Sequence, residues 1–204
     1  MSKVGVIGGA GSIGKVVVKY FQDNNYQVYI NDPKSKDSLE LNQLLDQCKL
    51  IYISVFPLEA TKEILKKIIT RADANEFIIL ENNSLKQLME PEFLELDNLG
   101  ASLCATHPLC KADQPWKNQN VILIPFGKHS RAALCLAKEL YQCASMKIHQ
   151  LNSFKEHDKL MCVFQLVPHL VMRIVAQLYS DLKLDWKLLE ELATANFKLF
   201  NLSL

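Results

Sequence analysis

The sequence predicts an α/β protein with a Rossmann-type, doubly wound, mostly parallel sheet, followed by a short all-helical C-terminal dimerisation segment. Strand and helix signals alternate over residues 3–150, and strands that alternate with helices form parallel sheets. A glycine-rich loop directly follows the first strand signal, and the strand signals stop after residue 152. A chain of 204 residues can form one α/β domain with an appendage. We therefore expect a dinucleotide-binding domain at 1–152 and a partial helical domain, for dimerisation and substrate, at 153–204.

Hydrophobic periodicity places the individual elements. Short apolar runs rich in β-branched residues predict strands that are covered on both faces, and apolar residues at helical spacing predict the helices between them. The expected strands are 3–8, 26–31, 50–55, 76–80, 101–106, 120–125 and 146–150. The expected helices are 12–24, 37–47, 59–72, 130–143, 154–180 and 186–204.

Charge and cysteine content exclude several classes of protein. The 23 basic and 22 acidic residues leave a net charge of +1, which favours neither nucleic acid nor a membrane surface as a partner. The six cysteines include no C-x-x-C pair, and no signal peptide is read at the start, so we expect a cytoplasmic protein. Cys104, His107 and Cys110 lack a fourth ligand at matched spacing, so no metal site is expected.

The first appended helix is apolar around most of its circumference. Its most apolar stretch, 160–178, is interrupted by polar residues and Pro168, which predicts a buried helix rather than a membrane span. Pro168 is expected to bend the helix near Phe164, because proline removes a backbone hydrogen bond. Too little chain remains to cover this helix, so we expect a homodimer through the C-terminal helices, including 197–204.

The glycine-rich loop matches the dinucleotide-binding pattern G-x-G-x-x-G. Gly9 is expected to permit a tight turn, Gly11 to let the backbone approach a pyrophosphate, and Gly14 to allow close packing of helix on sheet. The phosphates would lie at the N-terminus of the following helix, where unpaired N–H groups and the helix dipole favour an anion. The loop therefore predicts a dinucleotide cofactor.

An acid at the end of the second strand favours NAD over NADP. Asp32 follows Gly14 by 18 residues and is expected to accept hydrogen bonds from the adenosine ribose hydroxyls. A 2′-phosphate would be repelled by this carboxylate. Lys34 and Lys36 leave NADP open as the alternative, because either lysine could pair with that phosphate.

Hydride-transfer chemistry on a hydroxyl needs a group that takes its proton, and His107 is the candidate. It follows the strand 101–106, and the carboxyl ends of parallel strands carry ligand-contacting residues. Ser84 follows the strand 76–80 and could orient this imidazole, although Ser84 to Gln87 also matches a capping box. Both roles are compatible.

A polar stripe runs along the first appended helix. Asp158, Gln165 and His169 lie on one face at helical spacing, within an otherwise apolar segment. Polar side chains in such a setting need partners. They form either a satisfied hydrogen-bond network or a substrate site, and the spacing favours neither.

Four stretches of the chain together resemble the prephenate dehydrogenases of tyrosine biosynthesis. The stretches span nearly the whole chain in the family's order. They are Val4-Gly-Val-Ile-Gly-Gly-Ala-Gly-Ser-Ile-Gly14, Ile53-Ser-Val-Phe-Pro57, Glu81-Asn-Asn-Ser-Leu-Lys86 with Thr106-His-Pro-Leu-Cys-Lys-Ala-Asp113, and Glu156-His-Asp158 running to Pro168-His169.

The resemblance implies an oxidoreductase that uses NAD+ to convert prephenate, or the related arogenate, by oxidative decarboxylation; prephenate would give 4-hydroxyphenylpyruvate. It implies that His107 is the catalytic histidine and that Ser84 orients it and contacts the nicotinamide end. Gln165 and His169 would join them in facing the substrate. With the glycine loop, it implies cofactor contacts from Gly9, Gly11, Ser12, Ile13, Gly14, Asp32, Ser54 and Val55.

The chain also departs from the family pattern. It has Glu81 where the family has aspartate, Lys111 where the family has glycine, and Phe56 inserted before the proline that follows Ser-Val. The family's arginine for the substrate carboxylate would lie beyond residue 204, which implies a C-terminally shortened member. Two alternatives therefore stay open: a non-catalytic or regulatory dinucleotide-binding homologue, and a related reductase for another hydroxy acid, keto acid or imine.

Overall fold

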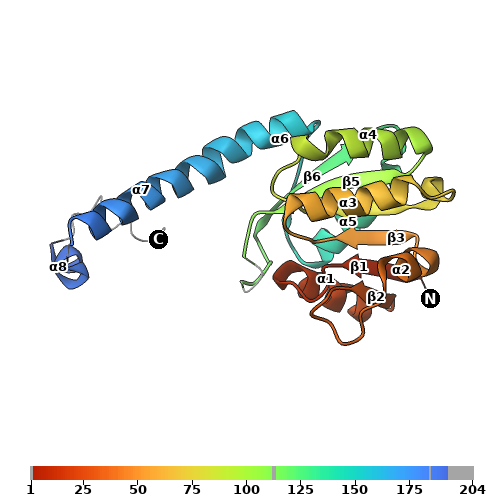
Figure 1. Ribbon diagram of the computed structural model, residues 1–204, viewed down its shortest axis with the longest axis horizontal. Coiled ribbons are helices and arrows are strands. Elements are labelled where there is room, and N and C mark those ends of the chain that lie inside the picture. The colour runs from red at the N-terminus through yellow and green to blue at the C-terminus, as the bar shows by residue number, and fades with distance from the viewer. Residues whose placement is uncertain (1, 112–113, 184, 193–204) are drawn as a thin grey trace. The chain divides into compact units, whose positions relative to one another are not determined.

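A single seven-stranded sheet forms the centre of the first of two compact units. The computed structural model describes residues 2–111, 114–183 and 185–192. Along the chain, the first unit ends at Asp158 and the second begins at Lys159. The strand order is β2-β1-β3-β4-β5-β6-β7 (Figure 1). The strands are β1 (Lys3–Ile7), β2 (Gln27–Asn31), β3 (Leu50–Ile53), β4 (Ile78–Glu81), β5 (Ser102–Pro108), β6 (Asn120–Phe126) and β7 (Lys147–Gln150).

The pairing of the strands confirms the predicted doubly wound, mostly parallel sheet. β1 pairs in parallel with both β2 and β3, so the chain crosses over β1 between those two strands. This crossover opens a crevice outside the carboxyl ends of β1 and β3, where such sheets bind ligands. β4 and β5 continue the parallel order, whereas β6 runs antiparallel to β5 and parallel to β7.

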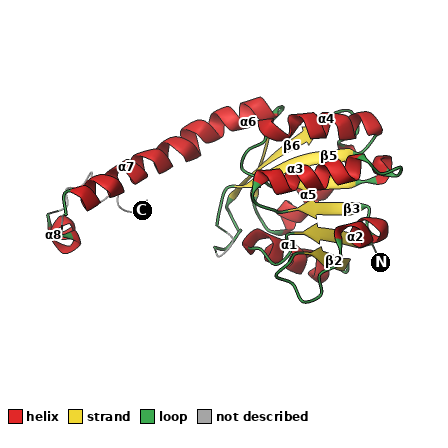
Figure 2. Cartoon of the chain, viewed as in Figure 1, coloured by secondary structure: helices red, strands yellow, loops and turns green. Residues whose placement is uncertain are grey.

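Helices cover both faces of this sheet (Figure 2). One face carries α1 (Ser12–Asp23) and α5 (Arg131–Cys143), which bury Val17, Phe21 and Tyr141 with the sheet residues in one apolar cluster. The opposite face carries α2 (Leu41–Gln47), α3 (Leu58–Ile69) and α4 (Glu90–Leu99). Two short 3-10 turns, η1 (Ala74–Glu76) and η2 (Gln87–Met89), complete the unit.

Helix α4 is absent from the sequence prediction. Its apolar residues do not mark one face clearly, because Phe93 and Leu96 are buried while Leu94 and Leu99 are exposed. Capping signals do mark its ends: a proline lies in the first turn, and Gly100 follows the last residue in the left-handed conformation. The parallel pairing of β4 with β5 requires a crossover of this kind.

The C-terminal part is helical, as predicted, but its first helix is not regular throughout. It consists of α6 (Phe154–Met161), a π-helical turn η3 (Cys162–Leu166) and α7 (Val167–Asp181). The π turn includes Phe164, the residue four positions before Pro168, so the widened turn lies where the sequence predicts a bend. α8 (Trp186–Glu191) follows, and the rest of the predicted helix to residue 204 lies outside the described residues.

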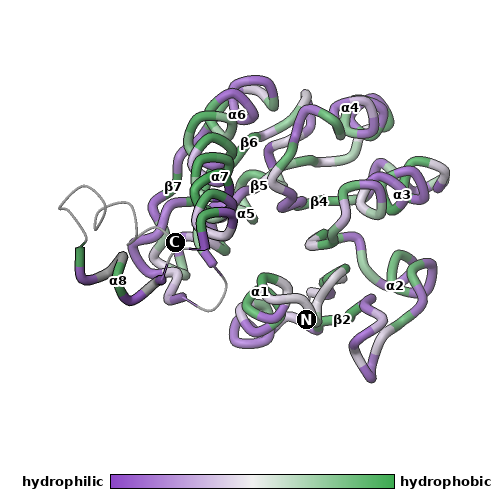
Figure 3. Tube along the Cα trace, turned by 60° about the vertical axis from the view of Figure 1, so that its left-hand side comes forward, coloured by the Kyte–Doolittle hydropathy of each residue, from purple (hydrophilic) through white to green (hydrophobic). Residues whose placement is uncertain are grey.

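The long helix exposes apolar side chains. α7 buries none of its residues within the chain, although a buried helix is expected from the sequence, and Figure 3 shows apolar residues along it. Leu170, Ile174 and Leu178 are among the exposed ones. The helix Phe154–Asp181 is long and apolar enough to cross a membrane by length and composition, a property that core helices of soluble proteins share.

Candidate functional site

The glycine turn follows β1 and leads into α1. Gly14 packs as predicted, because a Cβ atom there would overlap the carbonyl oxygen of Gly8. The residue with positive φ in this turn is Gly8 (φ 84°), just before the pattern begins, and a Cβ atom on Gly9 would meet the Ile30 side chain at 2.9 Å. A Cβ atom on Gly8 would overlap the carbonyl oxygen of Ser54 at the end of β3. The turn therefore brings the crevice ends of β1 and β3 into contact.

The first turn of α1 is open to an anion. Gly11 is its N-cap, no side chain caps the helix, and the first turn has no acidic residue. Both Gly11 and Ser12 are exposed, while Ile13 is half-buried. Unpaired N–H groups at such a helix end bind phosphate. These residues fit the predicted pyrophosphate position.

Asp32, which follows β2, contacts the glycine turn. Its carboxylate accepts hydrogen bonds from the backbone N–H of Ala10 (3.0 Å) and of Lys34 (2.8 Å). The acid thus ties β2 to the glycine turn, a contact that the sequence prediction does not include. Each carboxylate oxygen can accept a second hydrogen bond, so the carboxylate retains the capacity to bind a ribose hydroxyl.

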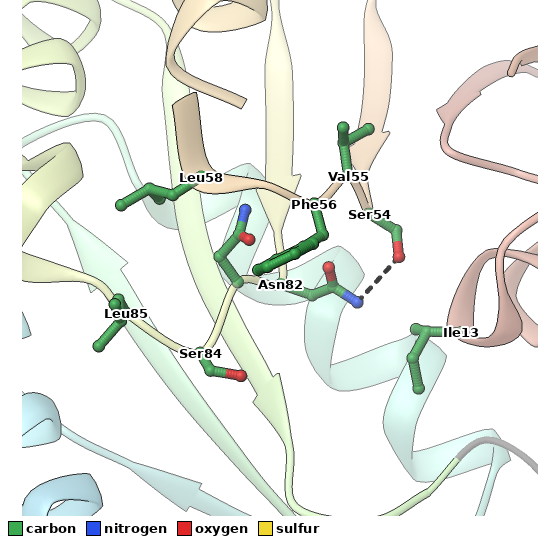
Figure 4. Close-up of a pocket in the computed structure, with 9 residues that line it drawn as sticks. Ile13, Ser54, Val55, Phe56, Leu58, Asn82, Ser84 and Leu85 are labelled. Carbon is green, nitrogen blue, oxygen red and sulfur yellow. Dashed lines mark hydrogen bonds between the residues drawn. The ribbon is translucent and has the colours of Figure 1, made fainter. Parts of the chain in front are cut away.

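Two cavities lie along this edge of the sheet and share four lining residues. The larger has a volume of about 540 Å³ and reaches Gly11, Ser12 and Asp32. The smaller, of about 320 Å³, reaches Asn82 and Ser84 beyond β4 (Figure 4). The shared wall consists of Ile13, Ser54, Val55 and Phe56. The predicted cofactor residues Ile13, Ser54 and Val55 therefore lie where the two cavities meet.

The loop after β4 supplies polar groups to the smaller cavity. Asn82 donates a hydrogen bond from its side-chain amide to the hydroxyl of Ser54 at 3.2 Å. Ser84 lines the cavity and is exposed, but no hydrogen bond joins it to another described residue. The predicted capping box at Ser84 is wrong, because η2 has no side-chain cap from its own N-cap residue. Its contact with the imidazole of His107 stays a prediction.

The cap for this turn comes from α6 instead. The carboxylate of Asp158 accepts hydrogen bonds from the backbone N–H groups of Lys86 (3.0 Å) and Gln87 (2.9 Å). A carboxylate in this position satisfies unpaired donors at the start of the turn. Asp158 therefore anchors the loop that carries Ser84, across 72 residues of sequence.

His107 lies at the same edge of the sheet, in the penultimate position of β5 rather than after it. It is buried, and its Nδ1 atom lies 2.9 Å from Nε2 of His157. Nδ1 of His157 lies in turn 2.7 Å from the Asp158 carboxylate. The sequence places His157 and Asp158 on this helix but does not join them to His107; the Glu156-His-Asp158 motif is the only signal.

The two contacts fix which nitrogen of His107 is free. An ionised carboxylate only accepts, so His157 donates from Nδ1 and presents an unprotonated Nε2. His107 must then donate from Nδ1, which leaves the lone pair on its own Nε2. That atom makes no hydrogen bond with any described residue. Burial, together with the charge of Lys86 and the neighbouring His157, lowers the pKa of His107 to about 3, so its imidazole is a neutral base.

A buried ion pair lies behind this site. Nζ of Lys86 lies 2.7 Å from the Glu81 carboxylate and donates to the carbonyl oxygen of Thr106 at 2.9 Å. Both side chains are fully buried. Burial raises the pKa of Glu81 and lowers the pKa of Lys86, while the opposite charge of each partner counters these shifts. The pair joins the end of β4 to the residue next to His107.

The predicted substrate residues Gln165 and His169 belong to the second unit. Gln165 lies in the π turn and is half-exposed, and His169 lies in α7 and is exposed. Their contact with a substrate stays a prediction. Within the described part of the chain, no three histidine, cysteine or acidic side chains form a group suited to a metal ion.

The sheet order, the glycine turn and the open helix end define a Rossmann-type dinucleotide-binding fold. Structural comparison finds solved proteins with a similar fold. The prephenate dehydrogenase of A. aeolicus, solved with hydroxyphenyl propionate and NAD+, superposes with a TM-score of 0.75 at 17% identity, over 100% of this chain and 78% of that one. The arogenate dehydrogenase of Synechocystis gives a TM-score of 0.73 at 17% identity, over 98% and 78%.

A second group of oxidoreductases shares the fold. The imine reductase of Myxococcus stipitatus, solved with NADP+, gives a TM-score of 0.58 at 14% identity, over 88% of this chain and 63% of that one. No protein-family model and no curated protein sequence matches the chain. The resemblance to prephenate dehydrogenases that the sequence predicts is confirmed as a resemblance of fold, and two of these similar structures contain a nicotinamide dinucleotide, NAD+ in one and NADP+ in the other.

Proposed function

We propose that this protein is a dinucleotide-dependent dehydrogenase that oxidatively decarboxylates prephenate or arogenate. The free Nε2 of the buried, neutral His107 carries the proposal. This base lies at the carboxyl edge of the sheet, where both cavities also lie. An oxidation of a hydroxyl-bearing carbon needs a base at that place.

NAD is the proposed cofactor. Asp32 lines the larger cavity, and its carboxylate would meet the adenosine ribose, which disfavours a 2′-phosphate. Lys34 lines the same cavity and keeps NADP as the alternative. Bound NAD+ would supply the hydride acceptor.

The residues of the chain would handle the proton. Nε2 of His107 accepts a hydrogen bond from the substrate's ring hydroxyl and takes the proton as the carbon is oxidised. The Nδ1–H of His107 stays hydrogen-bonded to His157, whose own Nδ1–H stays on Asp158. The negative carboxylate of Asp158, at the end of this series of hydrogen bonds, stabilises the positive imidazolium of His107 as it forms. Ser84 would hold the nicotinamide end beside it.

The substrate carboxylate needs a partner from elsewhere. No lysine or arginine lines the smaller cavity in the described part of the chain. We place Gln165 and His169 at the substrate, together with groups of a second subunit. The exposed apolar residues of α7 favour such a homodimer, because a monomer would leave them in water. Light scattering at micromolar concentration tests the dimer, and a clean monomer would refute it.

The function is tested by mixing the purified protein with NAD+ or NADP+ and either prephenate or arogenate. Reduced cofactor is followed by absorbance, and the His107→Asn variant is the matched control. We expect turnover with NAD+ that the variant lacks. No turnover above the variant with either substrate would overturn the proposed reaction, and dinucleotide binding without turnover would favour the non-catalytic alternative.

A reductase for another substrate is the second candidate. The lack of a cationic lining residue in the described part of the smaller cavity favours it, because prephenate carries two carboxylates and an imine or a simple keto acid carries fewer. Oxidation of NADH or NADPH in the presence of a panel of keto acids and cyclic imines distinguishes the two. No oxidation of NADH or NADPH with any compound of the panel would rule out this second candidate.

A further inference from the structure

Phe56 is an aromatic side chain left almost wholly uncovered at the centre of the cofactor edge. It follows β3, precedes α3, and is 90% exposed. It lines both cavities, and Figure 4 shows its ring pointing into the space that the other lining residues surround. A phenylalanine in this position exposes its whole ring to water unless a ligand covers it.

The surroundings of Phe56 match a flat, partly polar ligand. Val55, Leu58 and Ile13 supply apolar surface, and Asn82 supplies an amide from the loop after β4. Ligand sites combine such apolar walls with a few polar groups that orient the ligand. Single exposed apolar residues are common on protein surfaces, but this one lies on the wall shared by two cavities rather than on an open face.

We propose that the Phe56 ring stacks against the nicotinamide end of the bound dinucleotide. This inference rests on the proposed dinucleotide site and deepens it. With the adenosine end at Asp32 in the larger cavity, the other end of the ligand passes the shared wall into the smaller one. Nicotinamide is a flat aromatic ring, and aromatic rings gain free energy by offset stacking.

The charge of the nicotinamide ring makes the stacking selective between the two oxidation states of the cofactor. Oxidised nicotinamide is positively charged, whereas the reduced ring is neutral. A cation is attracted to the π face of an aromatic side chain. Phe56 therefore stabilises bound NAD+ more than bound NADH, which favours loading of the oxidised cofactor and release of the reduced one.

The test is calorimetric titration of the 204-residue protein with NAD+, NADH and ADP-ribose, which lacks the nicotinamide ring. Phe56→Ala should weaken NAD+ binding about tenfold, NADH binding less, and ADP-ribose binding by less than about twofold. Phe56→Leu keeps apolar area without a π face and should give intermediate values for NAD+. Leu94→Ala is the matched control, because Leu94 on α4 is 53% exposed and lines neither cavity.

The outcomes separate this inference from the proposed function. Wild-type protein that binds NAD+ and ADP-ribose, with Phe56→Ala unchanged for both, would overturn the stacking role and leave the dinucleotide site intact. Equal weakening of both ligands would also overturn it, since the ring would then act on the adenosine or phosphate part. Wild-type protein that binds none of the three ligands would overturn the proposed function and this inference together.

Discussion

The Nδ1 atom of His107 on β5 lies 2.9 Å from the Nε2 atom of His157 on α6, although 50 residues separate them in the sequence. Asp158 holds the far side of His157 and caps the turn after Ser84 with the same carboxylate. One short helical segment thus orients the candidate base and anchors the loop that lines the smaller cavity.

Replacement of His107 by asparagine should abolish turnover and leave the cofactor site intact. The introduced amide can still donate to His157, but it has no basic nitrogen at the position of Nε2. Loss of a general base commonly lowers the rate about 10²–10⁴-fold. Turnover is followed by cofactor absorbance and NAD+ binding by calorimetry. A variant that keeps wild-type turnover would remove His107 from the chemistry.

His157 is predicted to act as a positioning residue. In His157→Leu, the Nδ1–H of His107 loses its acceptor, and the imidazole no longer holds its lone pair on Nε2. We expect kcat to fall about 10–100-fold, a range typical of groups that orient a reactive side chain. His157→Gln retains an acceptor oxygen and should recover part of kcat. Equal losses in both variants would indicate a purely structural role.

Acidification should destabilise the fold through His107. Its pKa is about 3 in the folded protein, against about 6.5 for an unperturbed histidine. Between these values the unfolded chain binds more protons, so the free energy of unfolding decreases as pH falls through this window. The contribution of His107 between pH 7 and pH 5 is about 2 kcal/mol.

Urea unfolding at pH 7 and pH 5 measures this contribution. The wild-type protein should lose more stability than His107→Asn does over the same interval, by about that amount. An equal loss in the two proteins would show that His107 titrates normally in the folded state.

The ion pair of Lys86 and Glu81 should tolerate joint replacement better than the loss of one partner. Lys86→Met leaves the Glu81 carboxylate buried without its counter-charge, which commonly costs about 3–5 kcal/mol. Adding Glu81→Gln removes that charge, so the double variant should be more stable than Lys86→Met alone. Urea denaturation of the three proteins checks this order. A double variant as unstable as the single one would indicate that the lysine stabilises the fold without the pair.

Local patterns in the sequence were sufficient for most of the fold. The β-branched run of β1, the glycines from Gly9 to Gly14 and Asp32 after β2 lie within a few residues of the features that they specify. Their meaning depends on backbone geometry and period, which a short window contains. Helix α4 was missed because its apolar residues do not gather on one face, although its proline and glycine ends were readable.

The arrangement of the candidate site depended on contacts that no local pattern contains. The sequence predicts His107, Ser84 and Asp32 as site residues from their places after strands. The hydrogen-bond partner of His107, however, comes from a helix far along the chain. The same holds for Asp158, which caps a turn 72 residues away. A side chain's tautomer and pKa depend on burial and on neighbours brought together by packing.

Local sequence patterns are enough to predict the class of sheet, the place of the glycine turn and the types of side chain at the crevice. Three features follow only from the packed chain: which nitrogen of His107 is free, the positive φ at Gly8, and the exposure of Phe56 on the wall that the two cavities share. The two kinds of feature differ in the sequence separation over which they act. Periodicity and turn geometry act over a few residues, whereas burial, hydrogen-bond pairing and cavity shape arise only when distant segments pack together.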